Sequence, residues 1–170
     1  MTEASAGLSS AASPKKDAAR ITLRFESIDQ LMAEVDRLAE AEQAGRLQQL
    51  GNWTLGQTLG HLAEWIQYSY TGAPLTPPFF IKWVARLQKR KILYGPMRPG
   101  LRIPGVQGGT LATEPLSRDE GLARFRRAVE RLRTEPPTAP SPLLGQLTHD
   151  EAIALNLRHA ELHLSFLTPE

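Results

Sequence analysis

The feature that most constrains the fold is a helix-start signal that occurs four times along the chain. In a capping box, a Ser or Thr hydroxyl accepts from the third helical N–H, and a Gln or Glu three residues on reaches back to the cap N–H. Such pairs stand at Ser27/Gln30, Thr54/Gln57, Ser117/Glu120 and Thr148/Glu151. One match is a weak signal. Four matches, each followed by apolar residues at helical spacing, predict four amphipathic helices.

Apolar residues three and four positions apart give the extent of each helix. The predicted helices cover about 28–44, 55–70, 118–134 and 149–167. No segment reads as one of a series of alternating strands. The fold class is therefore all-α, and a four-helix bundle buries four such stripes, with a long connection between the second and third helices.

Length and composition fit one domain behind a tail. The chain has 170 residues, of which 41% are hydrophobic and 22% charged, as in an ordinary globular domain. Residues 1–20 are rich in Ala, Ser and Lys without periodicity, so we expect a disordered tail there and a single helical domain over 21–170. The tail lacks the apolar core of a secretory signal, and no apolar run approaches the roughly 20 residues that span a bilayer. We expect a cytoplasmic protein.

Three histidines on two of the predicted helices are the strongest candidates for chemistry. His159 and His163 are four residues apart, so they project from one face, roughly 6 Å apart along the helix axis. His61 lies midway along the second helix, and the three imidazoles can converge if these helices are neighbours. Three protein ligands leave positions open on a divalent ion such as zinc, nickel, iron or manganese. From spacing alone, hydrogen-bonded core histidines are the commoner alternative.

Polar residues near the histidines are candidates for supporting roles. Gln57 and Asn156 are placed to fix the orientation of the imidazoles. Glu64 is a candidate fourth ligand or general base, and Tyr68 a candidate donor to a developing anion. A capping or surface role fits each of these four residues equally well.

Other residues near the histidines are predicted to be structural. We expect His149 to be a surface residue at a helix start, and Glu161 to face solvent while pairing with Arg158. Trp53 is expected to pack against the first turn of the second helix.

Two glycines inside the second predicted helix indicate a close packing contact. Gly56 and Gly60 each cost about 1 kcal/mol relative to Ala in a helix interior. Their four-residue spacing predicts the close approach of another helix, which would bring His61 near its partners.

Charge is unevenly distributed along the chain. The formal net charge is only +2, yet no acidic residue occurs between Trp65 and Thr113. That segment holds seven basic residues: Lys82, Arg86, Lys89, Arg90, Lys91, Arg98 and Arg102. A solvated basic helix and loop is the simpler interpretation.

The alternative is a non-enzymatic binding module. Pro77 and Pro78 can open a short extra helix whose apolar residues share a face. The basic 79–102 segment would then hold an anionic ligand, a membrane surface or a partner. Its candidate contact residues are Phe79, Phe80, Trp83, Lys82, Arg86 and Lys89.

Two stretches of the chain resemble a known superfamily. Residues 51–57 read GNWTLGQ and are followed by GHLA at 60–63, which resembles the second-helix signature of the DinB-like (DinB/YfiT) superfamily. The ending LRHAELHLSFL at 157–167 resembles the fourth helix of the same group. The resemblance runs over about 24–167 and is nearest to the uncharacterised branch called domain of unknown function 1569.

The resemblance implies a DinB/YfiT-like four-helix bundle, often dimeric, with one divalent metal ion bound by the residues that correspond here to His61, His159 and His163. Characterised relatives include thiol S-transferases and a thiol-dependent isomerase, in which the metal activates a small thiol such as bacillithiol or mycothiol. This branch itself has no assigned chemistry. A metal-dependent transferase or hydrolase acting on a small-molecule substrate is the function that the resemblance favours.

The composition adds two expectations about partners. The chain has no cysteine, so a low-molecular-weight thiol would have to arrive as co-substrate. No nucleic-acid-binding motif is present and the net charge is small, so we expect no nucleic-acid partner. We also expect no membrane partner, while a homodimer is compatible with the sequence.

Overall fold

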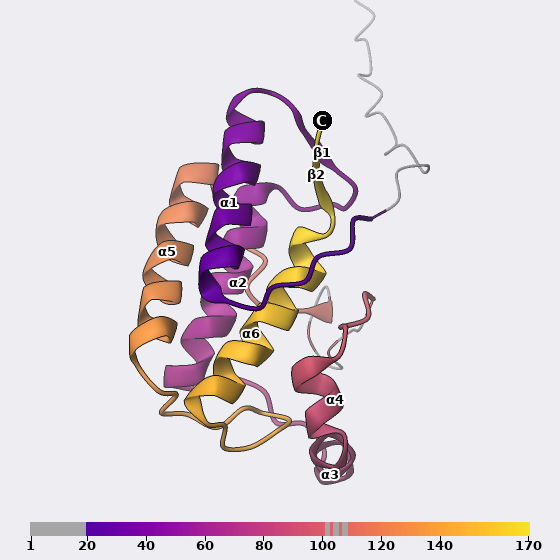
Figure 1. The fold of residues 1–170 in the computed structure, drawn as a ribbon. Coiled ribbons are helices and arrows are strands. Elements are labelled where there is room, and N and C mark those ends of the chain that lie inside the picture. Colours follow the sequence, from indigo (N-terminus) through magenta and orange to yellow (C-terminus); the bar gives the residue numbers. More distant parts are fainter. Residues whose placement is uncertain (1–19, 101–102, 104–105, 107–108) are drawn as a thin grey trace, which may run out of the picture.

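The computed structural model describes residues 20–100, 103, 106 and 109–170, and the chain is mostly helical (Figure 1). The long helices are α1 (Ile28–Gln43), α2 (Leu55–Thr71), α5 (Arg118–Thr134) and α6 (His149–Leu164). Two shorter helices, α3 (Phe79–Leu87) and α4 (Lys89–Tyr94), occupy the long connection, and the strands β1 (Leu47–Gln49) and β2 (Leu167–Pro169) pair antiparallel. Nearly all of the predicted tail, and Arg102, lie outside the described residues. Within the described ranges, none of the helices combines the length and apolar character that crossing a membrane requires.

All four predicted helix starts carry the expected hydroxyl cap. The Oγ of Ser27 and of Ser117, and the Oγ1 of Thr54 and of Thr148, each accept from the backbone N–H three residues on. The reciprocal bond of a full capping box is present only at the two Thr caps, which start α2 and α6. These are the two helices that carry the three histidines, so both helices have a fixed starting point.

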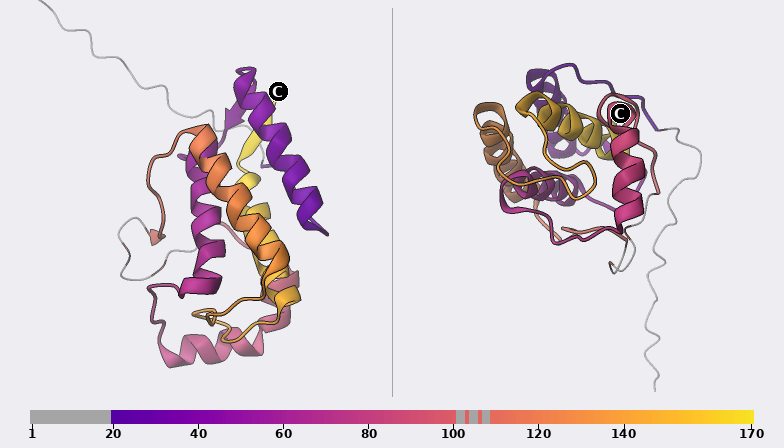
Figure 2. Two further views of the ribbon diagram at one scale, coloured as in Figure 1. Left: turned by 90° about the vertical axis from the view of Figure 1, so that its left-hand side faces the viewer. Right: turned by 90° about the horizontal axis from the view of Figure 1, so that it is seen from below.

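The four long helices pack side by side around one hydrophobic core (Figures 1 and 2). Every one of them contributes fully buried side chains, including Val35, Leu59, Phe125 and Leu164. Burying a side chain of this size contributes about 1.5–3 kcal/mol. The helices are therefore held by shared packing of their apolar stripes, as their sequence periodicity predicts.

The most extensive helix contact, between α2 and α5, depends on glycine. A Cβ on Gly56 would lie closer than 3.0 Å to the backbone of Leu116 and Ser117, and a Cβ on Gly121 equally close to the backbone of Gly56. Only glycine allows two backbones to approach in this way. At Gly60 the obstacle is different, since a Cβ there would meet only the end of the Leu116 side chain. The predicted close approach is confirmed at Gly56. The approaching helix is α5, whereas His159 and His163 lie on α6, so this contact does not itself bring His61 to the other two histidines.

Two strands that the sequence pattern does not reveal join the segment after α1 to the C-terminal end of the chain. Leu47 pairs with Pro169 and Gln49 with Leu167, and the backbone N–H of Leu50 donates to the Phe166 carbonyl at 2.9 Å. The prediction that the last helix runs to residue 167 is therefore wrong, because α6 ends at Leu164. Strands of three residues are too short to show an alternating pattern.

The expectation that Glu161 faces solvent is also wrong. Glu161 is only 7% exposed, and its carboxylate accepts from the backbone N–H of Phe25 at 2.6 Å. It does pair with Arg158, at 2.8 Å, and that guanidinium also donates to the Phe25 carbonyl. The segment before α1 crosses α6 (Figure 1), and the backbone of Phe25 in that segment bonds to both side chains of this pair. Helical periodicity carries no signal for this crossing.

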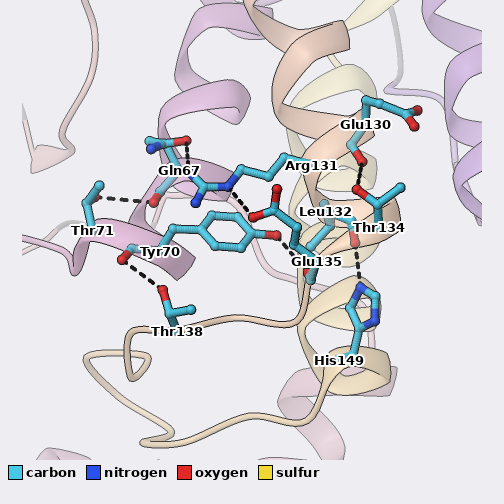
Figure 3. A network of polar contacts seen from close by, with 10 residues as sticks. All are labelled: Gln67, Tyr70, Thr71, Glu130, Arg131, Leu132, Thr134, Glu135, Thr138 and His149. Atoms are coloured by element: carbon cyan, nitrogen blue, oxygen red, sulfur yellow. Dashed lines mark hydrogen bonds and ion pairs between the residues drawn. The ribbon is translucent and has the colours of Figure 1, made fainter.

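Polar contacts tie together the ends of α2 and α5 and the start of α6 (Figure 3). The Tyr70 hydroxyl donates to the Glu135 carbonyl at 3.0 Å, and the Arg131 guanidinium lies over the Tyr70 ring. His149 Nε2 donates to the Leu132 carbonyl at 2.6 Å, one of the carbonyls left without a helical partner at the end of α5. His149 is thus at a helix start, as predicted, but half-buried against α5 and not a free surface residue.

Replacing the two α2 glycines is expected to have opposite effects. Helix propensity alone predicts that Gly56→Ala and Gly60→Ala each stabilise the protein by about 1 kcal/mol. Because backbone atoms face Gly56, we expect Gly56→Ala to lower the free energy of unfolding by about 1–3 kcal/mol. Gly60→Ala should be neutral or stabilising, since the Leu116 side chain can turn aside. Urea denaturation measures both, and equal stabilisation by the two variants would contradict the backbone contact.

Removing Glu161 is expected to be costly. Glu161→Leu leaves a buried guanidinium without its carboxylate and the Phe25 N–H without an acceptor, so the free energy of unfolding should fall by about 3–5 kcal/mol. Glu130→Leu is the matched control, because Glu130 faces Arg133 at the same helical spacing on the exposed side of α5. That exposed pair should contribute less than about 1 kcal/mol. Similar losses in the two variants would show that burial of the Arg158 pair is not what matters.

Candidate metal centre

His61 from α2 and His159 and His163 from α6 come together in the structure. One ring nitrogen from each residue can be chosen so that all three lie within 4.8 Å of one another. His61 Nε2 lies 3.3 Å from His159 Nε2, within hydrogen-bond distance. The ring centroids of the three imidazoles are 4.5 to 5.1 Å apart. The convergence predicted from the i, i+4 spacing and from neighbouring helices is therefore present.

The long connection orients the His61 ring. His61 is 1% exposed, and its Nδ1 donates to the Leu111 carbonyl at 2.9 Å. With the proton on Nδ1, the Nε2 of the neutral ring has a free lone pair directed at the other imidazoles. The residue after this carbonyl, Ala112, has φ 56°, which non-glycine residues seldom adopt. The backbone is thus bent to bring the carbonyl onto His61.

The spacing of the nitrogens suits a single metal ion. Metal–imidazole bonds of 2.0–2.1 Å at a tetrahedral ion place two nitrogens about 3.4 Å apart. The His61–His159 pair already has this separation, and the remaining pairs need to close by no more than about 1.4 Å. Among the described residues, the group contains no carboxylate, so it offers three nitrogen ligands. Such a donor set suits zinc, nickel, iron or manganese and leaves at least one position open.

Burial keeps the imidazoles in the form that binds metal. Burial lowers the pKa of His61 to about 4, against the opposing effect of the Leu111 and Ala112 carbonyls. Burial, followed by the charges of His61 and Arg20, lowers the pKa of His163 to about 3. The pKa of His159 is likewise lowered, first by burial and then by the other two histidines. All three rings are therefore neutral at pH 7, with lone pairs available.

Two tryptophans form walls around the histidines. The Trp53 ring is stacked on His163 with centroids 5.3 Å apart, and it lies 4.8 Å from His61. Trp65 lies 5.5 Å from His159, and its buried indole N–H has no hydrogen-bond partner among the described residues. Sequence reasoning assigned Trp53 to helix packing and gave Trp65 no role. The signal for Trp65 was its position, since it follows His61 by four residues on the same helix face.

The predicted supporting residues lie around the site without bonding to the imidazoles within the described structure. Gln57 completes the cap of α2 and also donates to the Thr113 carbonyl at 3.4 Å, and Asn156 donates to the Ala152 carbonyl within α6. Glu64 is close to Tyr68. Burial is the main effect that raises the pKa of the Tyr68 hydroxyl, and the charge of Glu64 and a hydrogen bond to Glu64 raise it further. The Tyr68 ring is 5.6 Å from Trp65, which connects it to the wall of the site. Their expected roles stay predictions.

The fold and the site define a class: a mostly helical chain in which two helices bring three imidazoles together at a candidate metal centre. The chain belongs to the family described as Protein of unknown function (DUF1569), whose profile matches residues 17–170. The comparison with curated proteins found no match, and neither did the comparison with solved structures.

The metal-free protein is expected to lose stability on mild acidification. The pKa of His61 is about 4 in the folded state and near 6.5 when unfolded, so between these values the unfolded chain binds more protons. The free energy of unfolding should therefore fall as the pH drops from 6.5 to 5, by up to about 1.4 kcal/mol per pH unit for each such histidine. Urea denaturation with a chelator present measures it. His163→Gln should flatten the slope, because the pKa of His163 is lowered to about 3 in the folded state. An identical slope in the wild type and this variant would contradict the prediction.

Proposed function

We propose that this chain is a metal-dependent enzyme with a DinB-like four-helix bundle, in which His61, His159 and His163 hold one divalent ion. It acts on a small-molecule substrate, most plausibly by transferring a low-molecular-weight thiol, with hydrolysis as the variant in which water replaces the thiol. The four-helix arrangement is supported by the core that α1, α2, α5 and α6 share. The superfamily is supported by the two sequence stretches that resemble it and by the DUF1569 match.

The observation that carries the proposal is the convergence of three neutral imidazoles from two helices. Burying three basic groups together opposes folding whenever one of them takes up a proton. Packing alone would be served better by apolar side chains at these positions. A divalent ion accounts for the cluster, because it uses all three lone pairs at once.

A divalent ion held there would lower the pKa of a bound thiol or water, which provides a nucleophile near neutral pH. The chain's own residues supply the rest of the site. Trp53 and Trp65 give an apolar wall that excludes water, and the indole N–H of Trp65, which has no partner among the described residues, can donate to a substrate. The Tyr68 hydroxyl is protonated at pH 7, as an ordinary tyrosine is, and its pKa is raised further by burial and by Glu64, so it can donate to a developing anion. The chain has no cysteine, so the thiol comes with the substrate.

Metal content tests the site directly. Protein purified without added metal, then dialysed against zinc, nickel, iron or manganese, should hold about one ion per chain by elemental analysis. His61→Ala and His163→Ala should each lose most of it, because two imidazoles bind an ion far more weakly than three. His149→Ala is the matched control and should keep it, since His149 contacts the Leu132 carbonyl and not the cluster. Wild-type protein without metal after all four dialyses would overturn the proposal.

The same proteins test the reaction. Loaded wild-type and His149→Ala proteins should accelerate the consumption of a small thiol by an electrophile, while His61→Ala should not. Turnover of an ester without any thiol would instead assign the hydrolytic variant. Full metal occupancy without either activity would leave the ion structural and end the claim of catalysis.

A further inference from the structure

Helix α3 carries its apolar side chains on the outside of the molecule. Its outer face consists of Phe79, Phe80, Trp83, Val84 and Leu87, which are 44% to 84% exposed. Its buried residue is the small Ala85. A surface helix normally turns its apolar stripe to the core and its polar side chains to water, so α3 has the reverse orientation. Contiguous exposed apolar surface of this kind marks an interaction site.

The rest of the fold holds α3 in this orientation. Figure 2 shows α3 lying across one end of the long helices, at a steep angle to them. The following helix, α4, packs on α6 through the buried Leu93, and Lys89 pairs with Glu151 at the start of α6 at 2.7 Å. The outer face of α3 is therefore presented by a fixed scaffold at one end of the molecule.

Basic side chains of α3 and α4 border this face, and neither helix carries an acidic residue. Lys82 and Arg86 lie along one edge of α3, where they line a hollow of about 280 Å³ together with Ser141. Arg90 and Lys91 follow on the exposed side of α4. In the part of the chain that the structure describes, none of these four basic residues forms an ion pair. The whole segment between Trp65 and Thr113 lacks acidic residues.

We propose that the outer face of α3 docks on the surface of an anionic phospholipid bilayer. Its aromatic and aliphatic side chains would enter the boundary between headgroups and acyl chains, while Lys82, Arg86, Arg90 and Lys91 contact lipid phosphates and carboxylates. An apolar, aromatic-rich helix face bordered by Lys and Arg is the pattern of helices that lie in this interfacial layer. An apolar hollow of about 360 Å³ between α3, α4 and Leu143 continues the same surface.

Charge argues against a second copy of the chain as the occupant. In a symmetric dimer the same patch meets itself, so the basic border would face an identical basic border with no carboxylate from this segment between them. On an anionic bilayer, by contrast, each basic side chain of this border can pair with a negatively charged lipid headgroup. The proposal departs from the expectation of no membrane partner and develops the membrane surface that the alternative interpretation of the basic 79–102 segment included.

Vesicle sedimentation tests the proposal with the full chain. Wild-type protein should sediment with phosphatidylcholine vesicles that contain phosphatidylserine, and stay in solution with phosphatidylcholine alone. Arg86→Gln/Arg90→Gln should weaken the partition about twenty-five-fold, since each basic residue near an anionic surface contributes roughly fivefold. Phe79→Gln/Trp83→Gln should weaken it at least tenfold and, because both side chains are exposed, leave the fold intact. The charge-matched control Arg127→Gln/Arg133→Gln on α5 should bind as wild type does.

Three results would overturn the proposal: no sedimentation of wild type at low salt, equal binding to vesicles without phosphatidylserine, or undiminished binding by Phe79→Gln/Trp83→Gln. Light scattering adds a fourth, since a wild-type dimer that this double variant abolishes would assign the face to a second copy. His61→Ala should sediment like wild type. The proposals of membrane docking and of a metal centre can therefore be disproved separately.

Discussion

The backbone contact between α2 and the start of α5 fixes the position on which the candidate site depends. Gly56 and Gly121 bring the two backbones together at the first turn of each helix. His61 lies little more than one turn further along α2, so its place relative to α6 follows from this contact and from the shared core. Close-packed interiors transmit small displacements. The nitrogens must meet within a few tenths of an ångström, and glycine at this contact is one source of that precision.

The connection between α2 and α5 also contacts α2 near His61. Leu116 fills the space above Gly60, and five residues earlier the Leu111 carbonyl accepts the His61 proton. A carbonyl that selects the protonated nitrogen also selects the lone pair that faces the cluster. The bent backbone at Ala112 is understandable in this context, since strain of about 1–3 kcal/mol persists only where the surroundings impose it. The orientation of the His61 ring in the candidate metal centre is thus set by a backbone carbonyl of this connection.

Sequence patterns within single helices predict the helix starts well and the candidate metal centre in part. The cap hydroxyls and the i, i+4 pair His159 and His163 are properties of one helix each, so they can be derived from neighbouring letters of the sequence. The partner of His61 Nδ1 is a backbone carbonyl fifty residues away, which no side-chain pattern encodes. The burial of Glu161 depends in the same way on the segment at Phe25. Trp53 was assigned to packing because its stacking on His163 exists only once α6 is in place.

The buried imidazole cluster and the outer face of α3 are two places where the described fold departs from the usual arrangement of apolar side chains inside and polar ones outside. Both exceptions lower the stability of the isolated chain. Sequences that specify one structure satisfy such rules at every level, and violations concentrate where a protein contacts something else. The lone pairs of the imidazole cluster could bind a positively charged ion. The exposed apolar and basic face of α3 could be covered by a surface that is apolar and anionic. A divalent cation and an anionic bilayer are the simplest chemical complements to these two features, and each acts on a different element of the scaffold.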